Sequence, residues 1–149
     1  MTEVLSTRSL LTHPEFQALL GFWERDRRAP ICLGDWLREQ GLELQGAVAE
    51  WCALYKDRPT FAPTGKEPKE SGVFPCWDSS SPEWYWGCYG GLDRTHHLPD
   101  YLLPYLHREG GSNSATHSWV DFYSPSSALV ALLDGWAEAL RDGHTLPPL

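Results

Sequence analysis

Long apolar runs are missing from this sequence of 149 residues. A helix that spans a membrane needs about 20 consecutive apolar residues, and no stretch approaches that length. Residues 1–6 also lack the cationic start and the apolar run of an export signal. Both absences predict a soluble protein that is neither exported nor inserted into a membrane.

Basic residues are scarce as well. The chain carries 12 Lys and Arg residues against 20 Asp and Glu residues, which gives a formal net charge of −8. Because such a chain repels phosphate backbones, we expect no nucleic-acid ligand. The same charge favours association with a basic partner.

Closely spaced cysteine pairs are absent. The chain has four cysteines, which never form a C-x-x-C pair and lie mostly in apolar stretches: Cys32, Cys52, Cys76 and Cys88. This pattern is typical of reduced, buried thiols, which behave as small hydrophobic residues. It predicts a cytoplasmic protein, with disulfides or metal ligation as the alternatives.

Catalytic motifs are also missing. The sequence has no phosphate-binding glycine loop, no nucleophile elbow and no H-E-x-x-H pattern, so we expect neither an enzyme nor a cofactor. One group of side chains has the chemistry to hold zinc: Cys76, Cys88, His96, His97 and His107. Its spacing fits no standard zinc pattern, which favours histidines in loops over a metal site.

Three apolar stripes at helical spacing occupy the first third of the chain. Thr12 and Glu15 have the spacing of a capping box and predict the first helix start. Pro30 suits the first turn of a second helix, and Gly41 suits its end. The stripes consist of Phe16, Leu19, Leu20 and Trp23, then of Leu33, Trp36 and Leu37, and finally of Leu44, Val48, Trp51, Cys52 and Tyr55. Because these stripes must bury one another, residues from about 10 to 56 should form a small helical bundle.

The chain then changes character. Residues 57–72 are rich in proline and in alternating charge, which predicts a connection between two parts of the fold. Residues 73–77, 83–89 and 117–123 are rich in aromatic strand formers. They predict a small antiparallel sheet of about three strands, the first two joined as a hairpin.

A final helix follows the last strand directly. Ser124 and Pro125 predict its start, and Gly143 predicts its end. Its apolar stripe consists of Leu129, Leu132, Leu133, Trp136 and Leu140. We expect this helix to pack across the sheet. The predicted fold is therefore a single α+β domain over residues 1–149, with the sheet and the last helix in residues 73–143.

One stretch resembles a known family. Residues 29–41 read Ala-Pro-Ile-Cys-Leu-Gly-Asp-Trp-Leu-Arg-Glu-Gln-Gly and are followed by Glu50-Trp51-Cys52. Over residues 15–55 this pattern resembles the short repeat-companion domain that is abundant among paralogues of planctomycete bacteria. The resemblance implies a small helical module of unknown activity, often attached to other domains, and it implies no catalytic residue.

Strand alternation selects the candidate binding residues. If Val120 and Phe122 face the core, the alternate residues of 117–123 face outward, and the middle strand likewise separates its tryptophans from its tyrosines. Exposed aromatic patches mark interaction surfaces, and Trp and Tyr are enriched at binding hot spots, although helices on both faces would make these residues core. The candidate partner- or ligand-binding residues are Trp84, Tyr85, Trp86, Tyr89, His117, Trp119, Asp121 and Tyr123.

These observations predict a small, acidic, tryptophan-rich module that binds a basic or extended protein partner, as an immunity or accessory protein would. Two alternatives remain. One is a hydrolytic or metal-binding enzyme in which Asp121 orients His117 beside the nearby histidines and cysteines. The other is a small-ligand binder that uses the aromatic face and would need a pocket there.

Overall fold

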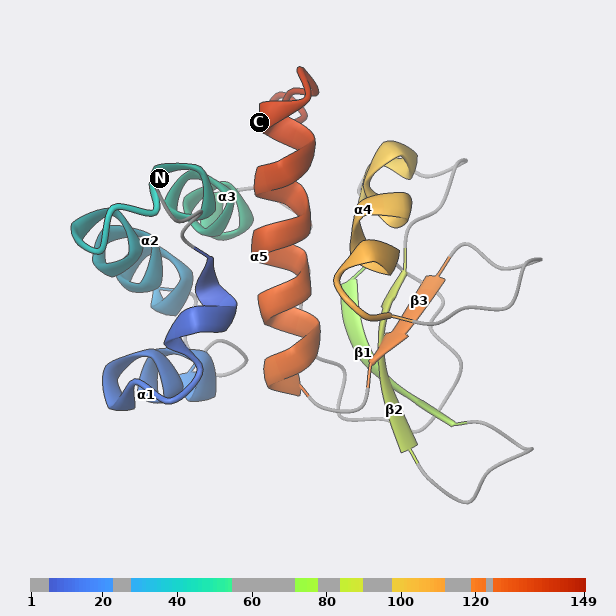
Figure 1. Ribbon diagram of the computed structural model, residues 1–149, viewed down its shortest axis with the longest axis horizontal. Coiled ribbons are helices and arrows are strands. Elements are labelled where there is room, and N and C mark those ends of the chain that lie inside the picture. The colour runs from blue at the N-terminus through green and yellow to red at the C-terminus, as the bar shows by residue number, and fades with distance from the viewer. Residues whose placement is uncertain are drawn as a thin grey trace.

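A long central helix organises the molecule (Figure 1). The computed structural model describes residues 6–22, 28–54, 72–77, 84–89, 98–111, 119–122 and 125–149. The central helix is α5 (Pro125–Arg141). On one side of it lie a short 3-10 helix and three helices: η1 (Thr7–Leu10), α1 (Pro14–Phe22), α2 (Ala29–Glu39) and α3 (Glu43–Leu54). On the other side lie β1 (Gly72–Trp77), β2 (Trp84–Tyr89), η2 (Asp100–Leu102), α4 (Leu103–Arg108) and β3 (Trp119–Phe122).

The predicted α+β class is wrong. Among the residues whose side chains are described, 72% are helical, and no complete strand or sheet lies among them. The part of the chain whose side chains are described is therefore mainly helical. The backbone of three strands forms a sheet in the order β1-β2-β3, and both neighbouring pairs are antiparallel. The aromatic runs form only short strands of four to six residues, whereas α5 alone spans 17 residues.

The predicted capping box of the first helix is also wrong. Helix α1 begins at Pro14, and the Nδ1 atom of His13 accepts a hydrogen bond from the Glu15 backbone N–H at 3.2 Å. The Glu15 carboxylate instead accepts a hydrogen bond from the indole of Trp36 in α2. Proline suits the first helical position because its missing N–H would be unpaired there anyway. Pro14 thus moves the helix start past Thr12.

Helices α2 and α3 form a close hairpin. Gly41 has a φ of +88°, and the Leu42 N–H bonds to the Leu37 carbonyl at 2.9 Å, which is the glycine-ended helix turn that the sequence predicts. The two helices cross at glycines: a Cβ at Gly34 would lie 2.9 Å from the Gly46 carbonyl oxygen. A side chain at either position would push the helices apart, so this crossing depends on glycine.

The apolar stripes of α1, α2 and α3 are largely confirmed. Their buried members are Phe16, Leu20, Leu33, Trp36, Leu37, Val48, Trp51 and Cys52. Leu19 and Leu44 are partly buried. Trp23, Tyr55 and the predicted connection up to residue 71 lie outside the described residues.

Helix α5 is buried on both sides. Its predicted stripe is confirmed, and the stripe members at most 1% exposed are Leu129, Leu132, Leu133 and Trp136. Residues on its other faces are at most 2% exposed too: Val130, Ala131 and Ala137. Because α5 packs on α3 as well as on α4 and the strands, the expectation that it packs across the sheet describes one side of it. It ends at Arg141, close to Gly143 as predicted, and Gly143 has a φ of +103°.

Two further findings complete the fold. Val120 is fully buried and Phe122 is 4% exposed, so the strand alternation predicted for β3 is confirmed at these two positions. No helix within the described ranges is long and apolar enough to cross a membrane.

Candidate functional site

The predicted binding residues lie on β2 and β3 or beside them. For those on the strands, the structure describes the backbone and not the side chains: Trp84, Tyr85, Trp86, Tyr89, Trp119 and Asp121. His117 and Tyr123 lie outside the described residues. Whether these side chains meet a partner therefore stays a prediction.

The strand register sorts these positions by face. Residues opposite each other in an antiparallel pair share a face, and Trp86 lies opposite Phe122 while Tyr89 lies opposite Trp119. With two-residue alternation, the positions on the face of buried Phe122 are Trp84 and Trp86, and those on the other face are Tyr85, Tyr89, Trp119 and Asp121. The predicted set thus divides between two faces of the sheet.

The register also separates the two strand cysteines that were candidate zinc ligands. Cys76 lies opposite Tyr85, whereas Cys88 lies opposite Val120, so the two positions fall on different faces. An ion held on one face would reach one of these positions and not the other. His107 belongs to α4, and His96 and His97 lie outside the described residues. Within the described side chains, no three His, Cys, Asp or Glu residues gather as a metal site.

The remaining cysteines are free thiols. Cys52 is buried in α3, as expected for a small hydrophobic residue. Cys32 is exposed on α2, so the expectation of burial is wrong there. The helix period turns Leu33 and Leu37 inward and places Cys32 about 100° around the helix from Leu33, outside the buried face.

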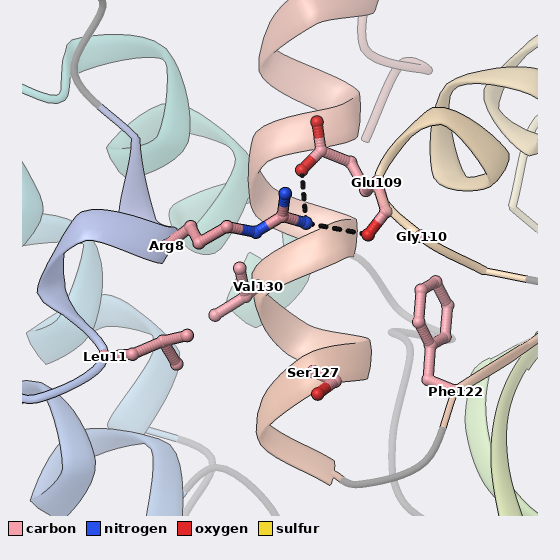
Figure 2. Close-up of a pocket in the computed structure, with 7 residues that line it drawn as sticks. All are labelled: Arg8, Leu11, Glu109, Gly110, Phe122, Ser127 and Val130. Atoms are coloured by element: carbon pink, nitrogen blue, oxygen red, sulfur yellow. Dashed lines mark hydrogen bonds and ion pairs between the residues drawn. The ribbon is translucent and has the colours of Figure 1, made fainter.

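A small pocket lies where η1, the end of α4, β3 and α5 meet (Figure 2). Its cavity has a volume of about 120 Å³. The lining residues are Arg8, Leu11, Glu109, Gly110, Phe122, Ser127 and Val130. Arg8 reaches across α5 toward Glu109: its Nη2 donates to the Glu109 backbone carbonyl at 2.7 Å and lies 3.0 Å from the carboxylate Oε2.

Glu109 is the electrostatically perturbed group of this pocket. Burial raises the pKa of its carboxyl above the usual range. The Arg8 guanidinium lowers that pKa, and the carboxylates of Asp134 and Glu138 raise it, so the net direction is upward. The folded chain therefore holds the Glu109 proton at a pH at which the unfolded chain has released it.

This shift predicts a pH dependence of stability. The protonated Glu109 carboxyl contributes to the free energy of unfolding. This contribution is fully present below the ordinary carboxyl pKa and is lost as the pH rises through the raised pKa. Between about pH 4 and pH 7, the wild-type chain should lose unfolding free energy relative to Glu109→Gln, which cannot ionise. Urea denaturation of both proteins across this interval measures the difference. A difference that stays constant with pH would contradict the prediction.

The pocket can hold little besides its own side chains. Sites for small molecules usually enclose about 300–1,000 Å³, well above the volume found here. Its guanidinium and carboxylate already pair with each other. The Arg8–Glu109 pair therefore joins the N-terminal segment to the end of α4, and the pocket has little room for a substrate.

Next to the pocket lies a buried carboxylate that the sequence analysis missed. Asp134 of α5 is 6% exposed and accepts hydrogen bonds from the backbone N–H of Thr7 at 2.8 Å and of Arg8 at 3.1 Å. The Gln45 amide of α3 donates to the same carboxylate at 3.2 Å. The available signal was a lone acid in the apolar run Leu132-Leu133-Asp134-Gly135-Trp136.

Comparisons with known proteins add no family to this description. The chain matches no protein-family model, no curated protein and no solved structure.

Proposed function

We propose that this protein is a small acidic interaction module that binds a basic or extended protein partner through the sheet face of Tyr85, Tyr89, Trp119 and Asp121. The observation that supports the proposal is the register, in which Tyr89 lies opposite Trp119 on the face averted from buried Phe122. Aromatic residues supply most hot spots of protein interfaces. The net charge of −8 would attract a basic partner before contact.

The resemblance of residues 15–55 to the repeat-companion domain is part of this proposal. Of the shared Asp-Trp-Leu residues, Trp36 and Leu37 are buried. The Oδ1 atom of Asp35 lies 3.6 Å from the Nη1 atom of Arg38 in the same helix. Packing explains Trp36 and Leu37, whereas Asp35 is exposed and pairs within its own helix. This suits a module whose scaffold is helical and whose contacts lie elsewhere. We place the module in the cytoplasm, where the free Cys32 and Cys52 thiols would stay reduced.

The test starts from the protein purified gently from its own host and analysed by native mass spectrometry, which reports any co-purifying chain. With that partner in hand, Tyr89→Ala and Trp119→Ala should each weaken binding at least about tenfold. Phe22→Ala is the matched control, because Phe22 is an exposed aromatic residue of α1 on the other side of the molecule, and it should change affinity less than about twofold.

Salt dependence tests the electrostatic part separately. The association rate should fall as the ionic strength rises, while the dissociation rate changes little. A partner whose association rate ignores salt, and whose affinity survives both strand substitutions, would overturn the proposal.

A further inference from the structure

Residues 144–149 follow α5 and form neither a helix nor a strand. Two of their backbone carbonyls are held by aromatic side chains from opposite sides of α5. The Tyr101 hydroxyl of η2 donates to the Thr145 carbonyl at 2.7 Å. The Trp51 indole of α3 donates to the Pro147 carbonyl at 2.8 Å. Leu146, between them, is partly buried and packs on the core.

Trp51, Tyr101 and Trp136 form what we call the aromatic cradle. The Trp136 indole donates a hydrogen bond to the Tyr101 hydroxyl at 3.0 Å. That hydroxyl in turn donates a hydrogen bond to the Thr145 carbonyl. The rings of Trp51 and Trp136 meet edge to face, with centroids 4.9 Å apart. Trp51 is 5% exposed and Trp136 is fully buried. The ring contact of Trp51 with Trp136 and the hydrogen bond of Trp136 to Tyr101 do not involve residues 144–149, so they orient both donors without a ligand, which lowers the entropy cost of binding.

The segment in the cradle has the chemistry of a peptide ligand. Its sequence is His-Thr-Leu-Pro-Pro-Leu. Proline fixes φ and holds the residue before it extended, so such a segment loses little freedom on binding. Aromatic-lined grooves recognise proline-rich peptides in this way. His144 adds a ring contact, stacked on Tyr101 with centroids 4.3 Å apart.

We propose that the aromatic cradle is a recognition site for extended, proline-containing segments of other proteins, and that residues 144–149 occupy it as an internal ligand. A partner segment would displace residues 144–149 and offer the same two carbonyls to Tyr101 and Trp51. This inference does not rest on the function proposed for the sheet face, because no cradle residue belongs to a strand. The internal ligand would keep the site closed until a competing segment is abundant.

The experiment uses the full chain with its internal ligand loosened. Leu146→Glu removes the apolar anchor, and Leu149→Glu adds the same charge at a residue that is 73% exposed. The probe is a fluorescent His-Thr-Leu-Pro-Pro-Leu peptide, and binding is read by anisotropy. We expect the peptide to bind the Leu146→Glu chain at least about tenfold more tightly than the Leu149→Glu chain.

Two further measurements identify the cradle as the site. Adding Trp51→Phe to the Leu146→Glu chain should weaken peptide binding about fivefold, because one hydrogen bond is lost. A peptide with both prolines replaced by alanine should also bind less tightly. Equal binding to the two glutamate variants, or no effect of Trp51→Phe, would overturn the proposal.

If the Leu146→Glu chain loses its near-ultraviolet circular dichroism, the wild-type chain provides the test. A short tether gives residues 144–149 an effective concentration in the millimolar range, so unlabelled peptide at about 10 mM should compete. Displacement would shift the indole N–H resonance of Trp51 in a saturable manner. A resonance that does not move over this range would overturn the proposal as well.

Discussion

Replacing Trp136 with alanine should lower the free energy of unfolding by about 3–5 kcal/mol, the range for truncating a large buried aromatic residue. Trp136 is fully buried, contacts Trp51 edge to face and donates a hydrogen bond to Tyr101. Alanine would remove both contacts and leave a cavity in the core beside α5. In a chain of this length the melting temperature should fall by about 10 °C.

Two variants separate volume from hydrogen bonding. Trp136→Phe keeps an aromatic ring and loses the indole N–H, so it should cost less than the alanine variant. Leu149→Ala is the control, because Leu149 is exposed and should change stability by less than about 0.5 kcal/mol. Urea denaturation followed by circular dichroism measures all three. A loss below about 1 kcal/mol for Trp136→Ala would contradict the packing described for α5.

The helices were the predictable part of this fold. Local signals determine them: proline near the start of α2, glycine at the ends of α2 and α5, and apolar residues at helical spacing. Such signals act within a few residues, and single-sequence reasoning captures them. The start of α1 was misplaced because Thr12 and Pro14 give competing signals, and proline occupies the first helical position.

The two-sided burial of α5 could not be predicted from its stripe. Leu129, Leu133 and Trp136 mark one apolar face, and alanines on the other faces are compatible with solvent as well as with close packing. What decides between them is the position of α3 and α4 in space. That information comes from contacts between distant parts of the chain, which a local pattern does not contain.

The candidate sites show the same limit. The sequence predicted that Val120 and Phe122 share one face of their strand, because strand alternation is a local rule, and their burial shows that this face points inward. The sequence did not predict the ion pair of Arg8 with Glu109 or the hydrogen bond from Tyr101 to the Thr145 carbonyl. Both join residues that are far apart in the chain. Charged and aromatic residues have many plausible partners, and tertiary packing selects among them.

Replacing Asp134 should cause the second large loss of stability, because this residue of α5 caps the start of η1. Ser6, the N-cap residue of η1, makes no side-chain cap hydrogen bond. The Asp134 carboxylate takes that role and bonds to the N–H groups of Thr7 and Arg8. It also accepts a hydrogen bond from Gln45. One carboxylate thereby ties η1, α3 and α5 together, and a negative group at the start of a helix is favourable.

Asp134→Ala should lower the free energy of unfolding by about 2–4 kcal/mol, because it leaves the buried N–H of Thr7 and the partly buried N–H of Arg8 without an acceptor. Asp134→Asn keeps one oxygen acceptor and the side-chain volume, so it should cost about half as much. Urea denaturation gives both values. Hydrogen exchange should also locate the damage, since the amides of Thr7 and Arg8 should lose protection before those of α5.

Thr7→Val is the matched control at this junction. The Thr7 hydroxyl is buried and has no hydrogen-bond partner among the described residues, whereas the Thr7 backbone N–H bonds to Asp134. Valine keeps the shape and the N–H and removes an unpaired hydroxyl, so stability should stay unchanged or rise. If Thr7→Val costs as much as Asp134→Ala, the side chain at position 7 holds the junction and the capping role of Asp134 is wrong. If Asp134→Ala alone is costly, the carboxylate joins η1 to the central helix.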